Sequence, residues 1–345
     1  MVEWKKLGDV ANLIRGKVIS KDYVRDNEGD YPVYSSQTAD NGVFGRINSY
    51  MFDGEYLTWT TDGAYAGTIF RRKGRFNITN VCGLIDLNDN KVNQDFLFYW
   101  LSKTAKGYVL EGMGNPKLMS NVASNIAIPI PSLSEQTRIV GILDTFTAAI
   151  ENLKQQIAER RKQYEHYRDQ LLDLEGKEGV EMKTVGEIAL KISSGKNKTK
   201  NETGLYPVFG STGIIAYTDD YVFDKPLILV ARVGANAGFV HMSYGKYDIT
   251  DNTLYVELSP NVKQKYILYL LVKENINKYA KGGGQPLITA SILKDIIIPL
   301  PSLAEQQRIV GILDTFEASI ANLEAQLKER EKQYEYYRNK LLTFE

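Results

Sequence analysis

Two stretches of this chain place apolar residues at alternating steps of three and four. The steps run over about four heptads in each stretch, and residues spaced in this way form one narrow stripe along an α-helix. Such a stripe is typical of a coiled coil. The predicted seam consists of Leu143, Phe146, Ile150, Leu153, Ile157, Tyr164, Tyr167 and Leu171 in the first stretch, and of Leu313, Phe316, Ile320, Leu323, Leu327, Tyr334, Tyr337 and Leu341 in the second.

The alternative interpretation is an amphipathic helix lying on a globular core, which would show a period nearer 3.6 and a wider apolar face. Arg160 and Arg330 occupy equivalent positions in the predicted seam. A long cation at such a position can reach solvent or meet a glutamate, and it then fixes the register of the two helices at some cost in stability. We therefore interpret both arginines as register-setting residues and not as catalytic ones.

The two stretches belong to a longer internal repeat. Residues 126–174 and 296–344 are related by an offset of 170 positions, and about 32 of the 49 aligned residues are identical. Each copy opens with a Pro-Ser-x-x-Glu pattern, at Pro131 and at Pro301, which predicts a capping box at the start of a helix. A helix of about 40 residues would be about 60 Å long, so the repeated segments are predicted to be rods.

The segments that precede the two copies are far less alike, although Gly63–Gly67 and Gly234–Gly238 show a shared frame. Strands follow these glycine-rich turns, which favours hairpins over phosphate-binding loops. The predicted strands and helices do not alternate as in βαβ units, so we expect α+β modules. The predicted strands are 56–60, 81–87, 227–231 and 253–258, and the predicted helices are 96–106 and 265–281, the latter stopped by Gly282-Gly283-Gly284.

We therefore expect two α+β modules separated by two long antiparallel coiled-coil helices. The linker is short, so the second module should start beside the far end of the first helix, and the second helix should run back along the first. Two similar units with one shared seam imply a pseudo-twofold axis, with the modules at opposite ends. The predicted boundaries are a first module at 1–131, a helix at 132–175, a linker at 176–181, a second module at 182–301 and a helix at 302–345.

Composition limits the class of protein. The hydrophobic content of 43% fits a globular chain, and no apolar run approaches the roughly 18 residues of a membrane span. The N-terminal sequence has no hydrophobic signal region, so we expect a cytoplasmic protein. The single Cys82 and the two histidines provide neither an internal disulfide nor a metal cluster. We expect Cys82 to be a buried strand residue.

The net charge of zero hides a partition between the segments. Lys and Arg number 15 against 14 Asp and Glu in residues 1–131, and 14 against 10 in residues 182–301. Each repeated segment, 132–175 and 302–345, has 6 against 8. The chain lacks the strongly basic surface that would indicate nucleic acid directly. If the chain binds DNA, partner subunits are expected to neutralise part of the phosphate charge.

Motifs for catalysis are absent from the sequence. There is no GxxxxGK[ST] phosphate loop, Asn115-Pro116 is followed by Lys117 in place of the Pro-aromatic pair of amino-methyltransferases, and nothing resembles a nucleophile elbow. We therefore expect no catalytic residues, no metal and no cofactor in this chain.

Two dense cation clusters on predicted loops are candidate DNA contacts. Arginine and lysine bind phosphates, and arginine also pairs with guanine in the major groove. Ordinary solvated loop charge is the alternative. The candidate DNA-binding residues are Arg71, Arg72, Lys73 and Arg75 in the first module, and Lys196, Lys198 and Lys200 in the second.

The order of these segments resembles a known family. A hydrophobic-Pro-x-Pro-Ser-Leu-x-Glu-Gln-x-x-Ile stretch launches each helix, from Ile128 to Ile139 and from Ile298 to Ile309. Trp4–Val10 and Met182–Ile188 match the usual start of each module. Over its whole length the chain is similar to specificity subunits of type I restriction-modification systems.

The resemblance implies that each module is a target recognition domain that reads one half of a split, asymmetric sequence in double-stranded DNA. The helices would act as spacer and as docking surface for two methyltransferase subunits, which carry S-adenosylmethionine and methylate adenine. Restriction subunits would join these and use ATP and Mg²⁺. A rival hypothesis is a two-headed protein-binding scaffold; salt-dependent DNA binding by the assembled complex would distinguish the two.

Overall fold

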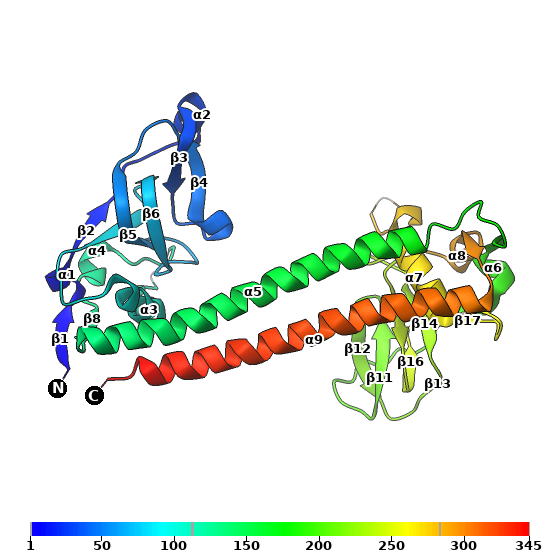
Figure 1. The fold of residues 1–345 in the computed structure, drawn as a ribbon. Helices are drawn as coiled ribbons and strands as arrows, with labels where there is room; N and C mark the ends of the chain where they lie inside the picture. Colours follow the sequence, from blue (N-terminus) through cyan, green and yellow to red (C-terminus); the bar gives the residue numbers. More distant parts are fainter. Residues whose placement is uncertain (1, 112–113, 283, 345) are drawn as a thin grey trace. The chain divides into compact units, whose positions relative to one another are not determined.

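The computed structural model describes residues 2–111, 114–282 and 284–344, and the chain divides into two compact units. Unit 1 combines residues up to 152 with those from 327 onward, and unit 2 spans Leu153–Gln326. Each unit contains one α+β module and one half of each of two long helices (Figure 1). The predicted fold class is confirmed.

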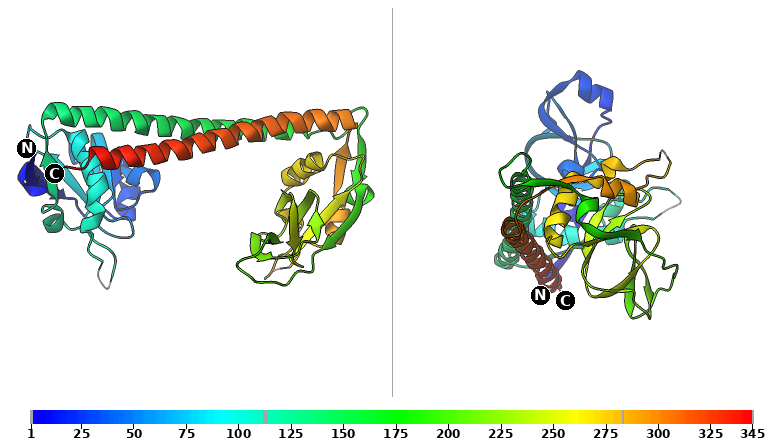
Figure 2. Two further views of the ribbon diagram at one scale, coloured as in Figure 1. Left: turned by 90° about the horizontal axis from the view of Figure 1, so that it is seen from below. Right: turned by 90° about the vertical axis from the view of Figure 1, so that its right-hand side faces the viewer.

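The long helices are α5, Leu133–Leu171, and α9, Leu303–Leu341, each of 39 residues. In unit 1 the first half of α5 packs against the second half of α9, and the Phe146 and Tyr337 rings stack with their centroids 5.3 Å apart. In unit 2 the order is reversed, and Tyr167 stacks on Phe316 at 5.4 Å. The helices therefore pair antiparallel, as predicted, and they lie side by side in every view (Figures 1 and 2).

The helix starts differ from the predicted capping boxes in one respect. The Glu135 backbone N–H donates to the Ser132 Oγ at 3.3 Å, so the hydroxyl caps the first turn as expected. The Glu135 carboxylate does not reach back; it binds the Arg138 guanidinium with both oxygens, each at 2.7 Å. A charge-assisted bidentate pair is stronger than a bond to one amide, which explains the choice. The second copy repeats this arrangement at Ser302, Glu305 and Arg308.

Module 1 has one six-stranded sheet of order β2-β7-β5-β6-β3-β4 and a two-stranded ladder of β1 and β8. Its strands are β1 Glu3–Lys6, β2 Ala11–Arg15, β3 Glu28–Tyr34, β4 Val43–Ile47, β5 Phe52–Thr60, β6 Ile69–Ile78, β7 Cys82–Leu87 and β8 Ala127–Ile130. Its helices are α1 Leu7–Val10, α2 Lys21–Asp26, η1 Ala39–Gly42, α3 Gln94–Thr104, η2 Ala105–Tyr108 and α4 Ser120–Ala123.

Module 2 has two four-stranded sheets, β10-β17-β14-β15 and β12-β11-β16-β13, and a ladder of β18 and β9. Its strands are β9 Glu181–Thr184, β10 Ala189–Ser194, β11 Tyr206–Gly210, β12 Gly213–Thr218, β13 Phe223–Asp224, β14 Leu227–Ala231, β15 Val240–Ser243, β16 Lys246–Ile249, β17 Thr253–Leu258 and β18 Ile297–Leu300. Its helices are α6 Val185–Ile188, α7 Gln264–Glu274, η3 Ile276–Tyr279 and α8 Ala290–Lys294.

The two modules share one strand order, which the pairing registers reveal. Phe52 pairs with Phe76 in module 1, and Phe223 pairs with Tyr247 in module 2, 171 positions later in both strands. The long β6 of module 1 corresponds to β15 and β16 together, which are separated at Gly245. The six-stranded sheet and the pair of four-stranded sheets are therefore two forms of the same layer.

Most predicted elements of the modules are found. The glycine-rich turns connect β5 to β6 and β14 to β15, which pair antiparallel, so the predicted hairpins are confirmed. The helix predicted at 265–281 is wrong at its end, because α7 stops at Glu274. Asn275 adopts a left-handed conformation with φ 51°, a backbone geometry that asparagine tolerates, and it ends the helix before the glycines. Gly283 lies outside the described residues.

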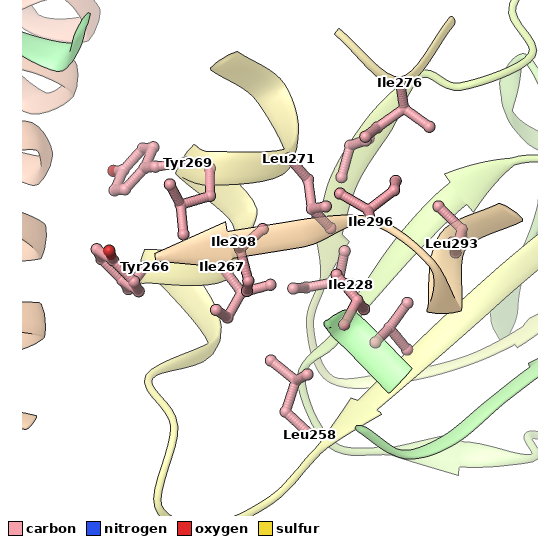
Figure 3. Close-up of a cluster of buried hydrophobic side chains, with 14 of the residues drawn as sticks. Ile228, Leu258, Tyr266, Ile267, Tyr269, Leu271, Ile276, Leu293, Ile296 and Ile298 are labelled. Carbon is pink, nitrogen blue, oxygen red and sulfur yellow. The ribbon is translucent and has the colours of Figure 1, made fainter. Parts of the chain in front are cut away.

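The core of module 2 lies between its first sheet, α7 and β18 (Figure 3). Ile267 and Leu271 of α7 lie towards Ile228 of β14 and Ile298 of β18, and Tyr266 closes the far side of this cluster from Ile228. The first turns of the long helices are part of these cores. Burying them anchors each helix in its module: Ile139 and Leu143 of α5 are fully buried in module 1, and Ile309 and Leu313 of α9 in module 2.

Candidate nucleic-acid interface and helix anchors

The four cations predicted on a loop of module 1 lie on strand β6. Arg71 joins three elements, because its Nε is 2.7 Å from an Asp95 oxygen on α3 and its Nη2 is 3.2 Å from Asp144 Oδ1 on α5. Its guanidinium also covers the Phe98 ring at 4.2 Å. The predicted loop location is therefore wrong, and Arg71 connects the module to the helix.

Arg72 points the opposite way, into the module, and is 3% exposed. Its Nε donates to Thr58 Oγ1 at 3.0 Å and its Nη1 to the Asn41 carbonyl at 2.8 Å, while the guanidinium lies over the Tyr34 ring at 3.5 Å. Burial lowers the pKa of Arg72 from its usual value. In this conformation its side chain has no open path to a phosphate.

The other two members of the cluster are exposed and paired. The Lys73 ammonium is 2.6 Å from Glu55, and the Arg75 guanidinium is 2.9 Å from Asp53 across the β5–β6 ladder. Alternating strand geometry explains why Arg71 and Lys73 face one side while Arg72 faces the other. A DNA-binding role for this cluster stays a prediction.

The cluster of module 2 lies on a loop, as predicted, between β10 and β11. Lys196, Lys198 and Lys200 are exposed, and among the residues that the structure describes no carboxylate lies within ion-pair distance of them. Asn197 between them binds the Asp248 carboxylate at 2.7 Å through its side-chain amide, and this bond fixes the loop against β16. These three lysines are free to meet an anionic ligand.

Asp144 and Asp314 are not among the site residues predicted from the sequence, although both lie in the repeated Leu-Asp-Thr-Phe segment. Asp144 Oδ1 accepts a hydrogen bond of 2.6 Å from the Tyr99 hydroxyl on α3, and Asp314 Oδ1 accepts one of 2.6 Å from Tyr269 on α7. Burial, and then the nearby carboxylate, raises the pKa of Tyr99 to about 12, which keeps the phenol protonated as a donor. Each module is thus held to its helix by the same tyrosine–aspartate bond.

The cation beside each aspartate comes from a different element in the two modules. Module 1 uses Arg71 on β6, whereas module 2 uses Lys265 on α7, with its Nζ 2.9 Å from Asp314. At the position equivalent to Arg71, module 2 has Met242, and at the position equivalent to Lys265, module 1 has Asp95. The helices thus keep the anion while the modules exchange the source of the cation.

A second pair of anchors is a buried glutamine. Gln136 is fully buried and accepts the Asn93 backbone N–H at 2.7 Å, while its amide donates to the Lys91 and Pro131 carbonyls, both at 2.8 Å. Gln306 does the same for the Lys263 N–H at 2.9 Å. The sequence contains a signal for this anchor. A glutamine occurs at the same position in both copies of the helix, on a face whose other residues are apolar.

The opposite end of each long helix also contacts a module. In unit 1, Lys103 of α3 donates to the Leu342 carbonyl at 2.6 Å, and the Phe344 ring packs on Phe96 and Trp100. In unit 2, Lys273 of α7 donates to the Asp169 carbonyl at 3.2 Å. Each module is therefore fastened to the start of one helix and the end of the other.

The predicted seam is buried only in part. Leu143, Leu313 and Ile157 are buried, whereas Tyr167 and Tyr337 are 46% and 40% exposed. Arg160 lies over the Phe316 ring at 5.9 Å and Arg330 over the Phe146 ring at 5.8 Å. In unit 2 the helices leave an open groove of about 560 Å³ between them, lined by Arg160, Gln163, Tyr167, Leu171, Ile312 and Phe316.

Neither Cys82 nor His241 has an environment that would activate it for covalent or metal chemistry. Burial raises the pKa of Cys82 to about 12, so its thiol stays protonated, and the predicted buried strand position is confirmed. Burial lowers the pKa of His241, whose ring lies between Phe209 and Phe239. In the described part of the chain, no three His, Cys, Asp or Glu side chains gather as metal ligands, and no helix is long and apolar enough to cross a membrane.

Comparison with known proteins agrees with this architecture. The sequence pattern of the type I restriction modification DNA specificity domain matches residues 1–160 and 177–332, one match for each module with most of its helix. The chain belongs to this family. Specificity proteins of type I restriction-modification systems are generally non-catalytic and do not themselves bind an enzymatic cofactor.

Individual relatives extend over the full chain. A Mycoplasma pneumoniae protein named as a type I specificity subunit is 30% identical over 98% of this chain and 97% of its own length. The crystal structure of a type I restriction-modification S subunit from M. genitalium superposes over 100% of this chain and 97% of its own with a TM-score of 0.71 at 16% identity. A chain from a structure of type I R-M system assembly gives 0.60 at 18% identity. Both structures support the specificity-subunit fold.

Proposed function

We propose that this chain is the DNA sequence-recognition subunit of a type I restriction-modification complex, in which each module reads one half of a bipartite, asymmetric target in double-stranded DNA. Module 1 corresponds to residues 1–131 and module 2 to residues 182–301. The observation that carries the proposal is the contrast between constant anchors and changed surfaces. Asp144 and Asp314 make the same bond in both units, while equivalent exposed positions of the modules carry unlike side chains, such as Lys73 and Tyr244.

The helices, within 132–175 and 302–345 and joined by 176–181, set the spacing between the half-sites. They also dock two methyltransferase subunits. Support comes from the groove beside Tyr167 and Phe316, which leaves aromatic surface uncovered on a coiled coil that would otherwise close. The repeated sequence supplies the same residues at the other end of the pair, including Tyr337 and Phe146. Two equal docking sites match two equal partners.

The partners supply the chemistry. Methyltransferase subunits carry S-adenosylmethionine and methylate adenine, and restriction subunits, where present, use ATP and Mg²⁺; the complex acts in the cytoplasm. The modules carry little net positive charge, with 15 Lys and Arg against 14 Asp and Glu in residues 1–131 and 14 against 10 in residues 182–301, so partner surfaces supply part of the phosphate neutralisation.

The test is to assemble the chain with its methyltransferase subunits and to map methylated adenines on a genome-sized DNA by sequencing. We expect two defined half-sites at one constant gap, and affinity that falls steeply with salt. Replacing residues 1–131 with the equivalent module of a relative should change one half-site only. Methylation without sequence preference, or a swap that changed both halves, would contradict the proposal.

Docking is tested by Tyr167→Ala combined with Tyr337→Ala. Both rings are well exposed, so the chain should fold normally while its complex with the methyltransferase subunits weakens. Tyr23→Ala is a matched control, because Tyr23 is 47% exposed on α2 and outside the groove. Equal partner affinity for the double variant and the control would exclude the groove as the docking site.

A further inference from the structure

Four segments meet at one edge of each module, and we call this edge the turn edge. In module 1 it contains the end of β2, the β5–β6 loop, the turn between β6 and β7, and the segment before β8. Backbone bonds join them: the Thr61 N–H donates to Val81 at 3.2 Å, and the Gly63 N–H to Pro116 at 2.9 Å. Module 2 repeats these bonds from Arg232 to Asn252 and from Gly234 to Pro286, at 2.9 and 3.0 Å.

An arginine is docked on the turn in each module. Arg15 donates through Nε to the Asn80 carbonyl at 3.1 Å, and its Nη1 lies 3.7 Å from the Met119 sulfur. Arg232 donates through Nη1 to the Asp251 carbonyl at 3.2 Å. Asn80 and Asp251 occupy equivalent positions in the two turns. The residues that precede them, Thr79 and Thr250, form β-bridges to equivalent loops of the two modules. Both modules thus hold a guanidinium against the same point of the backbone.

The two arginines reach this point from different strands. Arg15 ends β2, whereas Arg232 follows β14, and the residue of module 1 equivalent to Arg232 is Thr61. The repeated feature here is the guanidinium and its location, which indicates a ligand that needs it.

Charge at the turn edge differs from charge on β6. Neither Arg15 nor Arg232 has a carboxylate within ion-pair distance in the described part of the chain, and both donate only to neutral acceptors. The nearby carboxylate in module 1, that of Asp62, accepts a hydrogen bond from the Thr61 hydroxyl at 2.5 Å and forms an ion pair with Lys117 at 3.6 Å. A guanidinium has five N–H donors, so each arginine keeps donors for a ligand. By contrast, Arg71, Lys73 and Arg75 are neutralised by aspartate or glutamate.

The turn itself presents a second group beside each arginine. Both turns are four residues long and are closed by one bond, from the Cys82 N–H to Thr79 at 3.0 Å and from the Thr253 N–H to Thr250 at 3.2 Å. The side chains of Asn80 and Asp251 at their tips are exposed. The strands that flank each tip, β6 and β7 in module 1 and β16 and β17 in module 2, are each held by neighbouring strands in a sheet, which restrains the turn and lowers the entropy cost of binding.

We propose that the turn edge enters the major groove of duplex DNA and that Arg15 with Asn80, and Arg232 with Asp251, contact base edges; this rests on the proposed function. Arginine matches the O6 and N7 acceptors of guanine, asparagine matches N7 and N6 of adenine, and aspartate accepts from N4 of cytosine. The major groove is wide enough for a two-stranded ribbon. The unlike tips give the modules unlike preferences, as an asymmetric target requires.

The first experiment makes Arg15→Ala and Arg232→Ala separately and studies each variant as the complete complex with its methyltransferase subunits. The readouts are the methylated sequences and the Kd for duplexes with single base changes. Loss of a bidentate arginine contact should reduce discrimination about 5- to 150-fold at one base pair. Arg15→Ala should affect one half-site and Arg232→Ala the other. Unchanged melting temperatures would show that both variants fold.

Arg46→Ala is the matched control, because Arg46 also donates to a carbonyl, that of Asp30 at 2.8 Å, but lies on the edge strand β4. It should leave discrimination unchanged. The converse test is Asn80→Asp, which should move the preference at one base pair from adenine towards cytosine.

Two results would overturn the inference. The first is a complex with Arg15→Ala and Arg232→Ala that keeps wild-type discrimination; the second is an equal loss with Arg46→Ala. Both leave the proposed function intact if the wild-type complex still methylates a bipartite target. A wild-type complex without sequence preference would instead end the proposed function.

Discussion

The exchange of cations beside Asp144 and Asp314 can be tested by converting module 1 to the arrangement of module 2. Arg71→Met removes the cation from β6, where module 2 has Met242, and takes away the ion-pair partner of Asp95 and Asp144. Adding Asp95→Lys then places a cation on α3, where module 2 has Lys265 on α7. The single variant should be destabilised, and the double variant should recover.

The magnitude follows from the contacts. Arg71 forms two ion pairs whose partners are each 46% exposed, and solvent screening limits such pairs to about 0.2–1 kcal/mol each. Its position over the Phe98 ring adds about 0.5–1 kcal/mol. We therefore expect Arg71→Met to lower the free energy of unfolding by roughly 1–2 kcal/mol, and Asp95→Lys to restore more than half of that loss.

Tryptophan fluorescence during urea unfolding measures this effect in module 1 alone, because Trp4, Trp59 and Trp100 are the three tryptophans of the chain and all lie there. Lys73→Met is the control: its one pair, with Glu55, has a lysine side chain that is 83% exposed, so the cost should stay below about 0.5 kcal/mol. The reasoning fails if Arg71→Met costs no more than this control. It also fails if Asp95→Lys destabilises the Arg71→Met chain further.

Three other outcomes follow. A heptad inserted after Leu153 and after Leu323 should lengthen the rods by about 10 Å and widen the unread gap by roughly three base pairs; an unchanged gap in the methylation map would contradict the spacer role. Leu342→Ala, at 1% exposure, should cost about 2–5 kcal/mol in the tryptophan transition, whereas the equivalent Leu172→Ala in unit 2 should leave it unshifted. Burial holds the pKa of the Cys82 thiol at about 12 against an ordinary value of 9.0, so stability should fall as pH rises above 9, and alkylation at pH 8 should require unfolding.

The long helices and several of the strands were accessible from the sequence because their hydrophobic patterns are periodic. The three-four spacing from Leu143 to Leu171 survives in the structure as a paired helix, and the runs at 227–231 and 253–258 are strands with those bounds. Periodicity reports which face of an element is buried. It does not show whether a strand continues through a glycine. The arginine-rich part of β6 was therefore predicted to be a loop.

The candidate site was less accessible, because charge along a sequence says nothing about charge across a fold. Arg71 and Asp144 are 73 positions apart, and only the tertiary contact shows that one neutralises the other. Arg15 has no like-charged cluster beside it, and its docking on Asn80, 65 positions away, depends on the closed β6–β7 turn. An isolated arginine gave no local signal.

The ladder of β9 and β18 brings the two ends of module 2 together. Met182 is opposite Pro299 and Lys183 is opposite Ile298, so the chain enters and leaves this module on neighbouring strands. Adjacent antiparallel residues are only about 5 Å apart, so everything between them is topologically a single closed loop on the helical frame. Such a loop can be exchanged for one of another length or internal sequence while the helical frame keeps its geometry. The strands β9 and β18 are therefore suitable junctions for chains that combine modules of different specificity.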